Sequence, residues 1–257
     1  MKKAILFILI VSGLGIQPAK AQEALPSAVY LWDAQKAEKT SYGSAAQLLK
    51  GSTTHLSLLE IETVTVKKGK KVPEVRSEDM ETLVIVKDGT IGLNTAGINE
   101  ELEKGSIAVV LPGEGFSFKN DTKKSAVFYL MKYKSRSGID AARGSSSGGP
   151  FAVHWDKVEY RETKKGGRRN IFDRPTAMCE DFEMHVTNLN PGQESHPPHT
   201  HEVEEIILMI EGNVSMHIDG SEHPATIGDL SFLDSMVPHR PKNIGKEQCS
   251  YYAFQWK

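Results

Sequence analysis

The sequence has few of the features that define a nucleic-acid-binding, membrane-spanning or disulfide-stabilised protein. Its 257 residues include two cysteines and three tryptophans, and the formal net charge is only −2. A chain so close to neutrality, with no basic face of any length, is a poor nucleic-acid binder. Beyond the N-terminal segment, no stretch approaches the roughly 20 consecutive apolar residues that a transmembrane helix needs. The function must therefore be sought in local motifs rather than in composition.

The first 21 residues have the pattern of a secretory signal peptide. A pair of lysines precedes an apolar run, and Ala19-Lys20-Ala21 then supplies a small-x-small cleavage site. We therefore expect an exported protein, periplasmic or secreted, that keeps no membrane segment after cleavage.

Both cysteines, Cys179 and Cys249, lie in the C-terminal half. In an exported protein, a pair of cysteines raises the question of a disulfide. The interpretation that we favour is two buried, apolar thiols. Neither is predicted to bind a metal, because no second Cys or His stands at chelating distance in the sequence.

The chain aligns with itself at an offset of 123 residues, so that residues 28–134 fall on residues 151–257 without a gap. Four glycines of the first copy coincide with glycines of the second: Gly69, Gly89, Gly97 and Gly105 with Gly192, Gly212, Gly220 and Gly228. Glycines in turns that need positive φ should survive a duplication. Residues 135–150 are rich in Gly and Ser and are predicted to be a flexible linker or loose loop. Short Val-, Ile- and aromatic-rich runs between turns predict an all-β fold, a barrel or jelly roll.

A histidine- and glutamate-containing motif lies in the second copy, within residues 191–214. His199, His201 and Glu205 have spacings of two and four, so on a β-strand all three side chains would project to one face. His239 follows as a further candidate ligand. Imidazole nitrogens and a carboxylate that converge on one point are the donors that a divalent metal requires.

The two motifs resemble those of the cupin superfamily, G-x5-HxH-x3,4-E-x6-G and G-x5-PxG-x2-H-x3-N. The first motif is filled with six residues rather than five before the first histidine, and the second lacks its usual Pro and Gly. The matching positions are Gly192, His199, His201, Glu205 and Gly212, then Gly228, His239 and Asn243. The resemblance covers nearly all of the chain after residue 21. It implies two tandem cupin double-stranded β-helix (jelly-roll) barrels, with the ligands pointing inward.

The first copy serves as an internal control on the metal site. The four ligand positions correspond there to residues that do not form a ligand set: Arg76, Glu78, Thr82 and Phe116. Glu204 has a counterpart in Glu81, whereas Glu205 has none, so Glu205 is the predicted ligand. We expect the first copy to be a barrel without metal, in which Arg76 and Glu78 neutralise each other inside the vacated pocket.

Three histidines and one glutamate would leave one or two coordination positions open, as in a catalytic site. This donor set suits one divalent transition metal, Mn, Fe, Ni or Zn. The resemblance includes decarboxylases, dioxygenases, isomerases and hydrolases, so the reaction type and the catalytic residues stay open. We interpret the chain as a metal-dependent enzyme. The alternative is a non-catalytic cupin that binds a sugar or anion, or serves for storage.

Cationic side chains unique to the second copy indicate a small anionic substrate, a carboxylate or sugar acid. Arg168, His185 and Arg240 replace Ala45, Glu62 and Ser117. Arginine binds carboxylates in a bidentate fork. Arg240 can reach the pocket only if the flanking prolines make the chain irregular. The competing interpretation of the KKGGRRN stretch, residues 164–170, is a solvated loop. A homo-oligomer also stays open.

Overall fold

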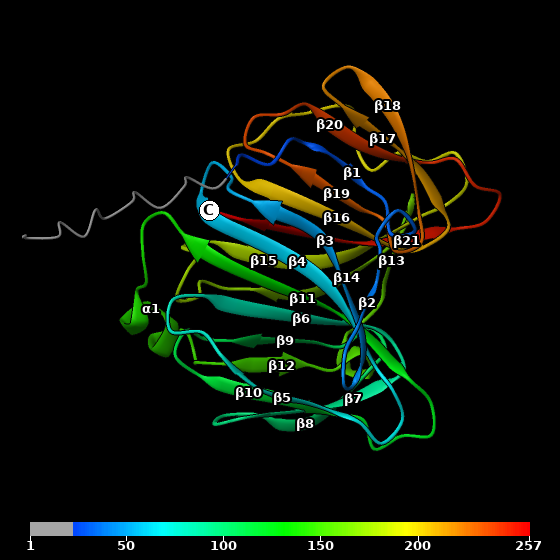
Figure 1. Ribbon diagram of the computed structural model, residues 1–257. Helices are drawn as coiled ribbons and strands as arrows, with labels where there is room; N and C mark the ends of the chain where they lie inside the picture. The colour runs from blue at the N-terminus through cyan, green and yellow to red at the C-terminus, as the bar shows by residue number, and fades with distance from the viewer. Residues whose placement is uncertain (1–22) are drawn as a thin grey trace, which may run out of the picture.

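The computed structural model describes residues 23–257, and Figure 1 shows it as stacked β-sheets. The signal peptide expected at residues 1–21 lies outside the described residues. The first repeat contains β1 (Ala28–Tyr30), β2 (Glu38–Lys39), β3 (Gly43–Gly51), β4 (Leu56–Val66), β5 (Lys71–Arg76), β6 (Glu81–Asp88), β7 (Thr90–Thr95), β8 (Asn99–Glu103), β9 (Ile107–Val110), β10 (Gly115–Lys119) and β11 (Ala126–Ser135).

The second repeat follows a short helix, α1 (Ala141–Ser146), and has a 3-10 turn, η1 (Trp155–Lys157). Its strands are β12 (Phe151–Val153), β13 (Arg161–Thr163), β14 (Gly166–Asp173), β15 (Phe182–Leu189), β16 (Glu204–Glu211), β17 (Asn213–Ile218), β18 (Ser221–Thr226), β19 (Leu230–Leu233), β20 (His239–Asn243) and β21 (Cys249–Trp256). The predicted all-β fold is confirmed. None of the helices in this part of the chain has the length and apolar character to cross a membrane.

Four sheets form two barrels. The N-terminal barrel combines a large sheet, in the order β12-β9-β6-β11-β4-β3-β2, with a small sheet, β5-β10-β7-β8. The C-terminal barrel combines β1-β19-β16-β21-β15-β14-β13 with β18-β17-β20. In Figure 1 the C-terminal barrel lies above the N-terminal one, and the two large sheets face each other between the small sheets.

The position of each strand in this stack explains its sequence pattern. β6 and β16 lie in the large sheets, which are covered on both faces, so their first six residues are all buried. Strands of the small sheets have one solvated face, and they alternate buried with more exposed residues, as in β10 and β20. Hydrophobic clusters fill each barrel, and the largest cluster lies between the large sheets with residues from both barrels.

The first strand of each repeat joins the sheet of the other barrel. β1 pairs with β19, and the equivalent strand β12 pairs with β9. The tryptophans that follow these strands also cross over, since Trp32 contacts Gly228 and Trp155 contacts Gly105. The self-alignment predicts which strands are equivalent, but it could not reveal this exchange.

The segment at residues 135–150 is more structured than the flexible linker or loose loop that its composition suggests. Its helix α1 is capped at the N-terminus by Asp140, whose side chain accepts a hydrogen bond from the Arg143 backbone N–H at 2.8 Å. Arg143 Nε donates to the Thr176 carbonyl at 2.7 Å, and Gly144 is buried against Ala177. These contacts fasten the segment to the C-terminal repeat.

Candidate metal centre

Three histidine rings converge inside the C-terminal barrel. Ring centroids are 5.2 Å apart for His199 and His201, 5.0 Å for His199 and His239, and 4.8 Å for His201 and His239. One ring nitrogen from each lies within 4.8 Å of the others. His239 begins β20, and it exchanges backbone hydrogen bonds with His199 at 3.3 and 3.1 Å.

The histidine pair does not lie on the regular strand that its spacing suggests. His199 forms only an isolated bridge, and β16 begins later, at Glu204. Backbone hydrogen bonds between His199 and His239 hold the loop that carries His199 and His201. The loop thus brings both rings to one point, as an extended strand would.

Glu205 completes the cluster from β16. Its Oε2 lies 2.9 Å from His239 Nε2 and 3.4 Å from His201 Nε2, and the side chain is 6% exposed. Burial opposes ionisation of Glu205, but the two histidines outweigh it and lower the pKa to about 2. Burial and the neighbouring imidazoles lower the pKa of His199 to about 4, so this ring is neutral at pH 7.

The outer nitrogens of two rings are held by the backbone. His201 Nδ1 lies 2.8 Å from the Val203 carbonyl oxygen, and His239 Nδ1 lies 2.8 Å from that of Val237. The inner Nε2 atoms of both rings are buried and have no partner with hydrogen-bond geometry among residues 23–257. Buried nitrogens without a hydrogen-bond partner, beside an ionised carboxylate, fit a metal ion.

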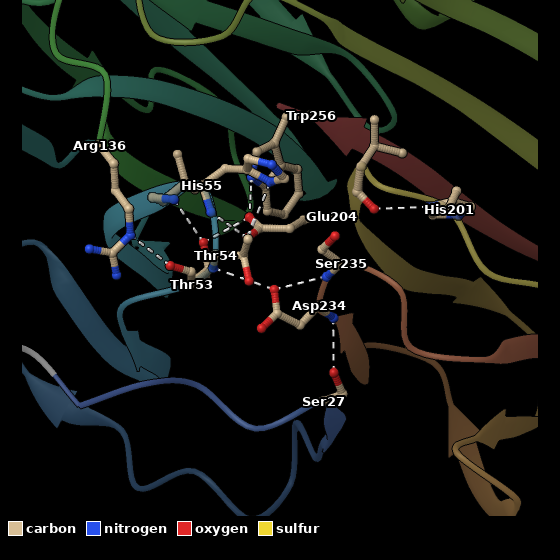
Figure 2. A network of polar contacts seen from close by, with 12 residues as sticks. Ser27, Thr53, Thr54, His55, Arg136, His201, Glu204, Asp234, Ser235 and Trp256 are labelled. Carbon is tan, nitrogen blue, oxygen red and sulfur yellow. Dashed lines mark hydrogen bonds and ion pairs between the residues drawn. The ribbon is translucent and has the colours of Figure 1, made fainter.

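Glu204, next to the cluster in sequence, faces the other side of the sheet. Figure 2 shows its carboxylate among groups of both barrels. It accepts hydrogen bonds from Thr53 Oγ1 at 2.7 Å, the His55 N–H at 2.7 Å and Trp256 Nε1 at 2.6 Å. Burial raises the pKa of Glu204 to about 7. The geometry thus places Glu205, not Glu204, with the histidines.

The equivalent Glu81 makes a matching contact in the opposite direction. It accepts hydrogen bonds from Tyr133 Oη in its own repeat and from the Met178 N–H of the second repeat, the latter at 3.2 Å. The persistence of this carboxylate in both copies therefore reflects the contact between the barrels.

A cavity of about 320 Å³ opens beside the histidine cluster. Its wall includes two of the predicted substrate-binding residues, Arg168 and His185. His185 Nδ1 lies 3.3 Å from Glu183 Oε1, and Arg168 lies 3.7 Å from the other oxygen of that carboxylate. The KKGGRRN stretch, residues 164–170, is not merely a solvated loop, because β14 begins at Gly166 and includes Arg168.

The N-terminal barrel is filled where the C-terminal barrel is hollow. Apolar residues stand at four equivalent positions: Phe116 for His239, Phe118 for Pro241, Phe128 for Tyr251 and Leu130 for Ala253. All four of these side chains are buried in the N-terminal core, and the Phe118 and Phe128 rings are 4.4 Å apart. Aromatic packing has replaced the cavity.

Two sequence expectations are wrong. Arg240 does not face the cavity, because β20 stays regular and adjacent residues point to opposite sides. Its guanidinium pairs instead with Glu194 at 2.7 Å and Glu222 at 2.6 Å. Arg76 and Glu78 are 3.9 Å apart, but their side chains are 56% and 77% exposed. They are therefore a surface pair, and phenylalanines occupy the vacated pocket.

Sequence reasoning missed other residues of the cavity wall. These are Tyr251, Ser195 and Gln255. His196, three residues before the predicted ligand His199, also lines the cavity, and its ring stacks on that of His199 with centroids 3.7 Å apart. A comparison of the two repeats could have identified Tyr251, because the equivalent residue of the first repeat is Phe128. Both cysteines are free and buried, which confirms the favoured interpretation.

Two antiparallel jelly-roll barrels, one with an inward-facing cluster of three histidines and a glutamate, define a β-barrel protein with a candidate metal site. The family described as "Cupin domain" matches residues 185–254, which contain all four clustered residues. The C-terminal repeat therefore matches the cupin family in sequence, over the residues that carry the candidate metal site.

The chain is similar to (S)-ureidoglycine aminohydrolase of Arabidopsis thaliana, with 22% identity over 183 residues. This match covers 69% of the chain and 58% of the plant protein, so the chain spans less than two thirds of that relative. The solved structure of Lactobacillus farciminis oxalate decarboxylase has a TM-score of 0.71 at 13% identity, covering 91% of this chain and 87% of that one. A putative glyoxylate induced protein of Pseudomonas aeruginosa has a TM-score of 0.70 at 16% identity, covering 94% and 93%. These structural likenesses concern the fold.

Proposed function

We propose that the protein is an exported, metal-dependent enzyme that acts on a small anionic metabolite, a carboxylate or sugar acid, in the C-terminal barrel. The observation that carries this proposal is the convergence of three imidazoles and a buried carboxylate beside a cavity of about 320 Å³. The same region of the N-terminal barrel is packed with phenylalanine.

His199, His201, Glu205 and His239 would hold the metal. Nitrogen and oxygen donors without thiolate suit Mn, Fe, Ni or Zn. When bound, such an ion supplies Lewis acidity toward a carbonyl or carboxylate oxygen. His199 is exposed, whereas His239 is buried, so the cluster is open to ligands on one side. An open side is what distinguishes a catalytic from a sealed structural site.

The cavity wall would bind and orient the substrate. Its volume is at the lower end of the range typical of small-molecule sites, which favours a metabolite of few atoms. Arg168 offers a guanidinium to a carboxylate, and His185 lies deeper on the neighbouring strand. Glu183 contacts both side chains and would fix their orientation until an anion arrives.

The comparisons support an anionic substrate without choosing a reaction. Oxalate, named in one structural relative, is a small dicarboxylate, and ureidoglycine, named in the plant relative, is an amino-acid derivative. The reaction type stays open among hydrolase, isomerase, decarboxylase and dioxygenase chemistry. The alternative function is a non-catalytic cupin that binds a sugar or anion. The open side of the cluster favours the enzyme.

Metal analysis of the purified protein and a screen of small carboxylates, with and without the metal, would test the proposal. We expect about one divalent transition metal per chain and its loss in the His199→Ala/His201→Ala double variant. His217→Ala, a matched histidine removal on β17 outside the cluster, should keep the metal. Full metal occupancy in the double variant would overturn the ligand assignment. Carboxylate binding without turnover by the metal-loaded protein would favour the non-catalytic alternative.

A further inference from the structure

A second and larger cavity, of about 790 Å³, lies between the two barrels. It is lined by the ends of β6 and β16 and by residues of both repeats. Alternation along the strands places Ile207 and Tyr251 on the wall of the cavity beside the histidines and Leu208 and Tyr252 on the wall of this one, while Asn188 lines both. We call it the junction cavity.

The walls of the junction cavity are aromatic. Trp32 packs edge-on against Tyr129, and Trp155 packs edge-on against Tyr252, with centroids 5.6 and 6.4 Å apart. Both tyrosine hydroxyls already donate to backbone carbonyls, Tyr129 to Gly228 at 3.3 Å and Tyr252 to Gly105 at 2.7 Å. These four side chains therefore offer mainly ring surface to a ligand.

Three cationic side chains line the cavity, Lys87, Lys104 and Arg169, and two of them, Lys87 and Arg169, lie over aromatic rings. Lys87 Nζ lies 4.7 Å from the centre of the Trp32 ring, and the Arg169 guanidinium lies 4.7 Å from Trp155 and 5.2 Å from Tyr160. Within the part of the chain that is described, neither lies within ion-pair distance of a carboxylate, although Arg169 Nη1 donates a hydrogen bond to the Val158 carbonyl. Burial lowers the pKa of Lys87, against a smaller opposing effect of Asp88. A partly buried cation without an anion is costly, so this wall is complementary to a negative charge.

Packing between the barrels does not require these cations. At the equivalent positions, Ile210 stands for Lys87 and Ala46 stands for Arg169. Asp88 and Glu211 also line the cavity, but neither lies within ion-pair distance of Lys87 or Arg169. The aromatic walls recur in both repeats, whereas each cation occurs in only one.

We infer that the junction cavity binds a small aromatic carboxylate. The ring would contact the tryptophan and tyrosine surfaces, and the carboxylate would accept hydrogen bonds from Arg169 or Lys87. Ile85, Val86, Leu208 and Met209 add apolar surface that the ring of such a ligand would bury. The volume lies within the range of small-molecule sites.

Calorimetric titration of the full chain with indole-3-carboxylate and with neutral indole-3-carboxamide tests this inference. We expect saturable binding of the carboxylate and at least about tenfold weaker binding of the carboxamide, because a charge-assisted hydrogen bond is lost. Equal affinities would overturn the inference. So would the absence of saturable binding for benzoate, indole-3-carboxylate and 2-naphthoate at millimolar concentration. This ligand comparison needs no variant and so does not depend on a variant's folding.

Variants of the cavity wall test whether the ligand binds in the junction cavity. Lys87→Ile/Arg169→Ala introduces the residues of the equivalent positions and should weaken indole-3-carboxylate binding at least about tenfold. Arg168→Ala is the matched control, since it removes the adjacent arginine on the opposite face of β14. Unchanged affinity in the double variant, or loss of binding in Arg168→Ala or His199→Ala/His201→Ala, would place the ligand elsewhere and overturn the inference.

Discussion

Two glycines beneath the crossed-over tryptophans offer a quantitative test of how the barrels are joined. Gly105 and Gly228 have φ of +91° and +93°, in the left-handed region that L-residues rarely adopt. A Cβ at Gly105 would stand 2.6 Å from Trp155 Cδ2, and a Cβ at Gly228 would stand 3.0 Å from Trp32 Cγ. Substitution by alanine therefore adds steric overlap to backbone strain.

The expected losses follow from adding these two contributions. Left-handed φ costs an alanine about 1 kcal/mol, and overpacking in a closed site costs about 1–3 kcal/mol. Because its overlap is deeper, Gly105→Ala should lower the free energy of unfolding by about 3–4 kcal/mol, and Gly228→Ala by about 2 kcal/mol. Gly220→Ala is the control for strain alone, at φ +82° with no atom within 4 Å of the added carbon, and should cost about 1 kcal/mol.

Urea denaturation of the three variants measures these differences through their midpoints, provided that the slope is unchanged. Replacing Trp155 by Leu in the Gly105→Ala background should recover part of the loss, because the two changes share one contact. Equal destabilisation by all three alanines, or strict additivity with the Trp155 change, would refute the argument that the tryptophan rests on the glycine.

Burial raises the pKa of both thiols, that of Cys249 to about 11. A thiol reagent at pH 8 should therefore label Cys179 and Cys249 only after denaturation. Rapid labelling of the native protein would contradict their burial. Glu204 has its pKa raised by burial from 4.5 to about 7, so the folded state binds this proton more tightly than the unfolded state. Its contribution to stability is fully present below pH 4.5 and is lost as the pH rises through 7. Urea midpoints at pH 4.5 and 8 should therefore differ less in Glu204→Gln than in the unaltered protein; an identical pH dependence would mean that Glu204 keeps an ordinary pKa.

The repeat was predictable because backbone conformation constrains glycine strongly. The pairs Gly69 and Gly192, Gly89 and Gly212, and Gly105 and Gly228 all have positive φ. These positions keep glycine after the surrounding side chains have diverged, so they align two copies with few other identities. The convergence of the histidines with Glu205 was likewise predictable, since the absence of these residues from the first copy singled them out.

The exchange of first strands was not predictable from the same alignment. β1 and β12 are three residues long, and their sequences, AVY and FAV, say nothing about which sheet they extend. The deciding contacts are long-range ones, such as Trp32 over Gly228 and Trp155 over Gly105. A local pattern identifies equivalent strands, whereas the partner of an edge strand depends on where the chain leads after it.

The error at Arg240 shows where local rules should have prevailed. Strand periodicity alone places His239 inside the barrel and Arg240 outside, as the structure has it. The neighbouring prolines suggested an irregularity, but Pro241 is buried within a regular β20 and lines the cavity beside the histidines. Its counterpart is Phe118, which fills the N-terminal barrel. A comparison of the two copies at every inward-facing position, rather than at the ligand positions alone, would have predicted the cavity itself. The smaller or more polar residues of the second copy leave the space that the phenylalanines of the first copy occupy.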